Sequence, residues 1–238
     1  MRKKTILLFA LLLTSQALAQ AAMSVKIVQL VGEVKVRRGV EEKWETAAIG
    51  TLLEEVDTIT TWERGEVVLE LSNGATFRLG GNAILDIADL REITERELFL
   101  LLMSQKVGKL APRSEKIPLR IGEVSAVRSE DKSAKQAGVR AATHIWQMET
   151  NAARALRAQN FLTNAALKLH RVKEKFLQRE DCGEVSLELA QVFEALRQTG
   201  RARDEYQAAF AECKTEACSE AATQKRMAVI AEALQRLQ

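Results

Sequence analysis

The feature that most constrains the fold is the stretch from residue 25 to residue 87, in which short apolar runs alternate with glycine turns. It opens with an alternation from Val28 to Val36, where every second residue is apolar or glycine. A period of two is typical of a β-strand that buries one face. The stretch therefore predicts an all-β region near the amino end of the chain.

The connections within this region carry turn signals. Asn73-Gly74 lies between the apolar runs 67–71 and 76–79 and is a strong signal for a β-hairpin. Thr58, Thr60 and Thr61 are β-branched and suit a pleated surface. Four glycines separate the runs at places where a tight turn can require a positive φ angle: Gly39, Gly50, Gly65 and Gly74.

Two groups of side chains in the β region are candidates for binding. We expect Trp44 and Trp62 to cover a small core, not to stack on a ligand. Glu54, Glu55 and Asp57 lie close together but lack the alternating oxygen ligands of a calcium-binding loop. We therefore expect a solvated acidic turn, with Asp57 as a turn residue.

The second half of the β region is less regular. Leu98–Met103 is a continuous apolar run, which indicates a buried strand. Alternation returns at Ile117–Ile121, and Ile121–Val124 is interpreted as a closing strand.

The order of these elements resembles the FecR domain, named for the periplasmic regulator of ferric-citrate uptake. The matching positions cover about a quarter of the 238 residues: Val34, Val36, Gly39, Trp44, Ala47, Gly50, Leu53, Asp57, Ile59, Thr61, Gly65, Val67, Leu69, Leu71, Asn73, Gly74, Arg78, Leu79, Asn82, Leu85 and Ile87. Val56 departs from the family, which usually has glycine before the aspartate. The resemblance implies a small β-sandwich or roll over residues 25–128 that acts as a periplasmic interaction domain. It does not carry over control of a sigma factor, because no anti-sigma segment or membrane helix precedes the FecR-like region.

The amino terminus has the three parts of a secretory signal peptide, which we assign to residues 1–19. Arg2–Lys4 form a positive segment, Ile6–Leu13 form a short apolar segment, and small residues precede a cleavage site between Ala19 and Gln20. The apolar segment is far shorter than the ~20 residues needed to span a bilayer. We expect a cleaved, exported protein in a bacterial periplasm that does not span the membrane.

The charge pattern argues against nucleic acid as a partner. The formal net charge is +3, but Arg2, Lys3 and Lys4 supply it, and the chain without the signal peptide is formally neutral. Nucleic-acid binding draws most of its affinity from neutralising phosphates. We expect no nucleic-acid ligand.

Beyond the β region the sequence pattern changes. Residues 129–138 are polar and are interpreted as a linker, and residues 139–238 contain no proline and have a helical period. This change predicts an all-α region made of helical hairpins. The expected helices lie near 139–158, 160–178, 184–198, 201–213 and 216–237.

Two of these segments resemble a tetratricopeptide motif, in which small residues let two antiparallel helices approach closely. A looser copy lies upstream, where Phe161 begins a second helix of the same kind. A plain array of amphipathic hairpins has similar spacing and remains the alternative. The motif positions are Leu189, Ala190, Phe193, Leu196, Ala202, Tyr206, Ala209 and Phe210, with Phe161, Ala165, Leu169 and Val172 in the looser copy.

Three cysteines, Cys182, Cys213 and Cys218, all lie in the helical region. An oxidising compartment favours one disulfide, and the hairpin geometry pairs Cys182 with either Cys213 or Cys218. The spacing of the cysteines and of His144 and His170 does not fit a zinc site. We expect no metal, no cofactor and no catalytic residue, because no nucleophile lies beside a base in any known motif.

Two functional hypotheses follow. The first is a non-enzymatic periplasmic scaffold that binds a protein or an envelope polymer. The alternative is a sensor whose FecR-like region contacts an outer-membrane receptor or a signalling system. Because the period changes across a polar segment, we expect two independent domains with few contacts between them.

Overall fold

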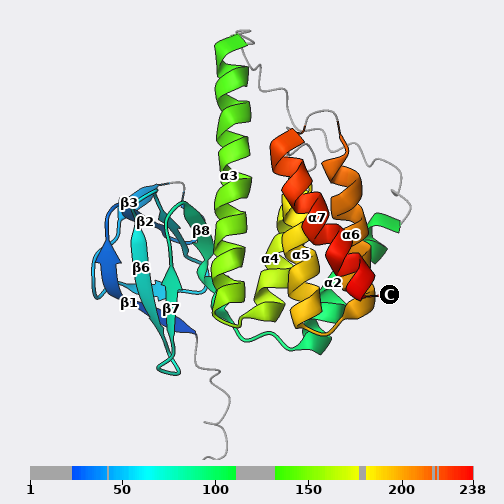
Figure 1. The fold of residues 1–238 in the computed structure, drawn as a ribbon. Helices are drawn as coiled ribbons and strands as arrows, with labels where there is room; N and C mark the ends of the chain where they lie inside the picture. The colour runs from blue at the N-terminus through cyan, green and yellow to red at the C-terminus, as the bar shows by residue number, and fades with distance from the viewer. Residues whose placement is uncertain are drawn as a thin grey trace, which may run out of the picture.

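In the computed structural model, two four-stranded antiparallel sheets form a sandwich, and a helical region follows it (Figure 1). The structure describes residues 23–41, 43–110, 132–176, 181–215, 218 and 220–237; for residues 105–110, 132–144 and 220–222 it describes the backbone alone. The predicted order of an all-β region followed by an all-α region is confirmed.

The sandwich is built from short strands. One sheet has the order β4-β1-β6-β7 and the other has the order β3-β2-β5-β8. Thus β4 and β7 are the edges of the first sheet, and β3 and β8 are the edges of the second. The strands are β1 (Ser24–Val31), β2 (Val34–Arg37), β3 (Trp44–Thr46), β4 (Leu52–Glu54), β5 (Thr58–Thr61), β6 (Glu66–Leu71), β7 (Thr76–Leu79) and β8 (Ala83–Asp86).

The alternation in β1 differs in phase from the sequence prediction. The fully buried side chains are Val25 and Ile27, whereas Val28 is only partly buried. The register of β1 against β6 shifts between Ile27 and Gln29, which marks a β-bulge. A bulge inserts one extra residue and changes which side chains face the core.

The glycines serve two different purposes. Gly74 has a φ angle of +81° in the turn between β6 and β7, so the predicted hairpin and its turn residue are confirmed. Gly65 does not have a positive φ angle, and that prediction is wrong. A Cβ atom at Gly65 would lie 2.4 Å from the carbonyl oxygen of Glu33, so glycine is needed there for close approach of two chain segments.

Five helices after residue 131 correspond to the five predicted helices. The first of them starts at Lys132, so residues 132–138 are helical and the prediction of a linker over them is wrong. Most of these residues are Lys, Ser, Ala and Gln, which a helix accommodates at small cost. The helices are α3 (Lys132–Ala158), α4 (Leu162–Lys175), α5 (Glu184–Ala195), α6 (Thr199–Cys213) and α7 (Glu220–Arg236).

The apolar run Leu98–Met103 is not a strand. It belongs to helix α2 (Glu95–Leu110), which follows the short 3-10 helix η1 (Ile87–Leu90). The amide of Glu97 donates a hydrogen bond to Oγ1 of Thr94 at 3.2 Å, in the spacing of a capping box. Leu98 and Leu102 are buried, and α2 lies against α4. Among the described residues, β8 is the last strand of the region predicted over 25–128, and the predicted strands 117–121 and 121–124 lie outside the described residues.

The sandwich and the helices are not independent. Helix α3 lies along β8 and β7 on one side, and α4 packs on its other side (Figure 1). The remaining helices follow in order, with α4 against α5, α5 against α6 and α6 against α7. Buried apolar side chains from both regions form one continuous cluster, so the expectation of few contacts between the regions is wrong.

Candidate functional site at the junction of the two regions

Helix α3 and the turn after it bind the sandwich through side-chain amides. The amide of Gln159 makes two hydrogen bonds to one residue of β7: its Oε1 accepts from the backbone N–H of Arg78 at 2.7 Å, and its Nε2 donates to the Arg78 carbonyl at 2.8 Å. Higher on α3, Nδ2 of Asn151 donates to the carbonyl of Asn82 at 2.8 Å. These contacts hold α3 against the edges of both sheets.

A buried ion cluster joins η1 to helix α4. Nζ of Lys168 lies 2.7 Å from Oδ2 of Asp89, and both residues are only 2 % exposed. Arg171 donates to the other oxygen of the same carboxylate. Burial alone would raise the pKa of Asp89, but the positive charges of Lys168 and Arg171 outweigh it and lower the pKa below its ordinary value of 3.8. Asp89 is therefore an anion at neutral pH, and its partners come from the other region.

The segment after η1 is fixed by two further residues of α4. Nδ2 of the buried Asn164 donates to the carbonyls of Asp89 and Arg91 at 2.8 and 2.7 Å. Oγ1 of Thr163 donates to the carbonyl of Ile93 at 2.8 Å. Buried backbone groups need such partners, so the start of α4 sets the path of the chain from η1 into α2.

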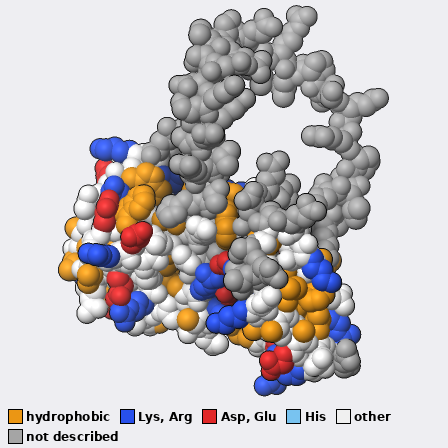
Figure 2. All heavy atoms as spheres, turned by 45° about the horizontal axis from the view of Figure 1, so that its top comes forward, with side chains coloured by type: hydrophobic (Ala, Val, Ile, Leu, Met, Phe, Trp, Pro, Cys, Tyr) orange, Lys and Arg blue, Asp and Glu red, His pale blue; other side chains and the backbone are white. Residues whose placement is uncertain are grey.

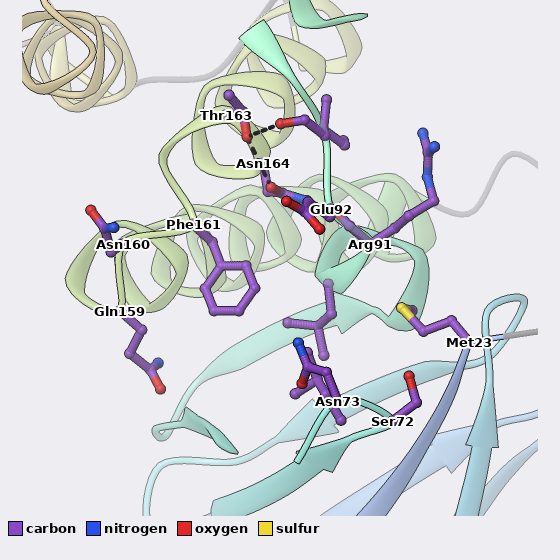
Figure 3. A pocket seen from close by; sticks show the side chains of 13 residues that line it. Met23, Ser72, Asn73, Arg91, Glu92, Gln159, Asn160, Phe161, Thr163 and Asn164 are labelled. Carbon is purple, nitrogen blue, oxygen red and sulfur yellow. Dashed lines mark hydrogen bonds between the residues drawn. The ribbon is translucent and has the colours of Figure 1, made fainter. Parts of the chain in front are cut away.

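These contacts enclose a cleft of about 670 Å³, which we name the junction cleft. Figure 3 shows Phe161 pointing into it from the α3–α4 turn, with Asn73 of the β6–β7 hairpin and Met23 on other sides. The ring of Phe161 also meets the ring of Phe77 edge to face, at 5.6 Å between centroids. The cleft is lined by Met23, Leu71, Ser72, Asn73, Leu90, Arg91, Glu92, Ile93, Gln159, Asn160, Phe161, Thr163 and Asn164.

The lining is mostly uncharged. Arg91 and Glu92 are its two ionisable residues, and Arg91 is engaged by Glu97 at 2.6 Å and lies 3.9 Å from Glu55. The other lining side chains are amides, hydroxyls and apolar groups. Such a surface matches a polypeptide, which offers amide groups and apolar side chains, better than it matches a strongly charged ligand.

The wider surface shows no large area of one charge on the face drawn in Figure 2. Blue Lys and Arg side chains and red Asp and Glu side chains alternate there over both regions. Electrostatic attraction of a highly charged polymer needs a concentrated field, and that face does not provide one.

The cysteines lie away from the junction cleft. The sulfur atoms of Cys182 and Cys218 are 2.14 Å apart, at disulfide distance, so the structure selects Cys218 from the two partners that the sequence allowed. Cys213 is free and buried, and its thiol donates to the carbonyl of Cys182 at 3.1 Å. Burial raises the pKa of the Cys213 thiol. This group joins the start of α5 to the end of α6, at the opposite end of these helices from the α3–α4 turn (Figure 1).

Asp57 is a turn residue, as predicted, but it is not solvated. It is 3 % exposed and accepts hydrogen bonds from the amides of Gly39 and Glu54, both at 3.0 Å, and from Arg38 at 2.6 Å. Burial would raise the pKa of Asp57, but the two amides and Arg38 lower it overall. The prediction of a solvated acidic turn is wrong for this residue, because local donors replace its water.

Trp44 and Trp62 do not belong to the buried apolar cluster, so the prediction that they cover a core is wrong. Each lies beside a cation from β2: Arg37 is 5.4 Å from the ring of Trp44, and Lys35 is 5.9 Å from the ring of Trp62. Val34 and Val36 of β2 point inward, so Lys35 and Arg37 project from the outer face of their sheet.

Several predicted features lie partly or wholly outside the described residues. The signal peptide with its cleavage pair Ala19 and Gln20 lies outside the described residues, and so does the side chain of His144. Among the side chains that are described, no three His, Cys, Asp or Glu residues gather in a way that could hold a metal ion. None of the described helices is long and apolar enough to cross a bilayer.

The residues that build the junction were not predicted from the sequence. Lys168 lies on the same helical stripe as Phe161, Ala165 and Val172, which is otherwise apolar. A lysine inside such a stripe signals a buried ion pair, because lysine is almost never fully buried without a partner. Asp89 gives the matching signal, since it lies between the apolar residues Ala88 and Leu90 of η1.

No family model, curated protein or solved structure matches the chain.

Proposed function

We propose that the chain is a non-enzymatic scaffold that holds a segment of a partner protein in the junction cleft. The observation that carries this proposal is the construction of the cleft: its walls come from the sandwich, η1, the α3–α4 turn and α4, and the hydrogen bonds of Asn164 and the ion cluster lock them together. A surface fixed in this way loses little conformational freedom when it binds a partner.

We further propose that the sandwich is a FecR-like domain and that α3–α6 are two tetratricopeptide-like hairpins. In support of the second point, the small motif residues Ala165, Ala190, Ala202 and Ala209 are fully buried where the helices pack. Small buried residues allow the close approach that such hairpins need. Location in the periplasm remains part of the proposal and is based on the signal-peptide pattern of residues 1–19.

A second candidate function is a sensor whose sandwich contacts a membrane receptor. The observation that favours it is the outer face of the β3-β2-β5-β8 sheet, where the cations Lys35 and Arg37 lie beside Trp62 and Trp44. Trp and Arg are enriched where proteins contact one another. This face is separate from the junction cleft, so the two candidates can be tested side by side.

The test uses a photo-reactive amino acid at single positions of the full chain in its bacterial envelope. Positions Ser72 and Asn160 report on the junction cleft, Trp62 reports on the outer sheet face, and the exposed Val229 on α7 is the matched control. We expect the same partner to be cross-linked from Ser72 and Asn160 and not from Val229.

The partner is then purified, and its affinity is compared for the wild type and for Ser72→Trp, which adds a bulky side chain to the lining of the cleft. A loss of affinity in this variant supports the scaffold proposal. Cross-linking from Trp62 alone would favour the sensor, and an unchanged affinity for Ser72→Trp would contradict a role for the cleft.

A further inference from the structure

The edge of β7 that faces the helical region is only partly covered. At Arg78, the side-chain amide of Gln159 takes the place that a neighbouring strand would occupy, since it accepts from the backbone N–H and donates to the carbonyl. A primary amide carries the same donor and acceptor as a peptide group. The contact therefore shows that an amide group can satisfy the main-chain donor and acceptor on this edge of β7.

The next outward position on this edge is Thr76. Main-chain groups two residues apart on a strand point to the same side, so the N–H and carbonyl of Thr76 point outward like those of Arg78. The main-chain groups of the alternate residues face β6, because the carbonyl of Ala75 accepts from the amide of Leu71 at 2.8 Å. Thr76 is exposed.

The junction cleft shares Gln159 with this edge of β7. Its lining includes Gln159 and Asn160 on one side and Asn73 of the same hairpin on the other. Phe161 points into the space between them (Figure 3). A chain that ran along β7 would therefore have main-chain partners on the strand and room for its side chains in the cleft.

We propose that an extended segment of the partner protein adds to β7 as a fifth strand of the β4-β1-β6-β7 sheet. It pairs with Thr76 and replaces the amide of Gln159 at Arg78. This inference rests on the proposed scaffold function and specifies the form of its ligand. Strand addition draws its affinity from main-chain hydrogen bonds and its specificity from pockets for side chains.

The probe is a nonapeptide selected from a random display library on the full mature chain and then synthesised with a fluorescent label. Its matched control is the same peptide with N-methyl groups on alternate residues, which removes main-chain donors and keeps every side chain. We expect the N-methylated peptide to lose binding, and hydrogen exchange of the Thr76 amide to slow when the unmodified peptide is bound.

Two variants of the chain test the edge directly. Thr76→Pro removes the outward N–H, and we expect it to weaken binding about tenfold. Leu52→Pro on the edge strand β4 is the control, since Leu52 is exposed and its carbonyl already faces away from β1 toward Arg38. Gln159→Ala uncovers Arg78, and we expect about fivefold tighter binding; it also keeps the test informative if Thr76→Pro fails to fold.

The outcomes separate the two proposals. Equal binding of the N-methylated peptide, or unchanged hydrogen exchange at Thr76, would overturn strand addition and leave the scaffold proposal standing if Ser72 and Asn160 still cross-link the partner. A library that yields no binding peptide would also overturn strand addition. If neither Ser72 nor Asn160 cross-links a partner, the scaffold proposal itself is overturned.

Discussion

The β4–β5 turn and η1 each bury an aspartate, and the two carboxylates are satisfied in opposite ways. At the β4–β5 turn, Asp57 is held by Arg38 and by the amides of Gly39 and Glu54, all within 19 residues of it in the chain. At the junction, Asp89 is held by cations of α4 that are 79 and 82 residues away. The first carboxylate shapes one turn, whereas the second fixes one region of the molecule on another.

The largest expected effect comes from Asp89→Asn, which leaves Lys168 buried without its anion. Removing one partner of a buried ion pair destabilises a protein by about 3–5 kcal/mol. We expect a loss of this size in the free energy of unfolding, measured by urea denaturation. Asp86→Asn is the matched control, because Asp86 lies 3.8 Å from the same lysine but its side chain is 44 % exposed.

The control should cost less than about 1 kcal/mol, as exposed pairs do. Equal losses in Asp89→Asn and Asp86→Asn would show that the ion cluster does not join the two regions in the way described.

A smaller effect is expected for Asp57→Asn. The amide retains one acceptor oxygen, but its NH₂ group then faces a backbone N–H that has lost its partner. An unsatisfied buried donor costs about 1–3 kcal/mol. Urea denaturation should report this loss, and Glu55→Gln in the same turn should show almost none, since the side chain of Glu55 is 50 % exposed. A loss larger than that of Asp89→Asn would reverse the comparison.

The smallest effect is a dependence on pH. The folded-state pKa of both Asp57 and Asp89 is lower than the ordinary value of 3.8. A group with a depressed pKa stabilises the fold above its unfolded-state pKa, and this contribution is lost as pH falls through the folded value. We therefore expect the urea concentration at the unfolding midpoint of the wild type to decrease when the pH is lowered below about 4.

Asp57→Asn and Asp89→Asn should each flatten this acid response in part, because each removes one of the two groups. A response in both variants that is as steep as in the wild type would assign the effect to other residues.

The difference between the two aspartates also explains what the sequence could predict. Periodicity located the β6–β7 hairpin at Asn73-Gly74 and the five helices after residue 131, because these signals are local. Helix α2 was missed because a short apolar run fits either a strand or a helix, although Thr94 and Glu97 already carried a capping signal.

The junction could not be predicted in the same way. No local pattern connects Gln159 with the backbone of Arg78, since the contact depends on how α3 lies along the sheet edges. The cysteine pair was limited to two choices by hairpin geometry, and only the path after α6 selects Cys218 over Cys213. At the junction the sequence shows only an unusual feature, a lysine within an apolar stripe, and does not say where its partner lies.

The wide separation in sequence across the junction makes its contacts cooperative. Its hydrogen bonds join residues that are 69 to 82 positions apart, so the first of them to form must close a loop of that length. Closing such a loop costs about 4 kcal/mol of entropy, whereas a single hydrogen bond returns about 1 kcal/mol. One contact alone therefore does not persist. Once Asp89, Asn164 and Gln159 are engaged together, each holds the loop closed for the others.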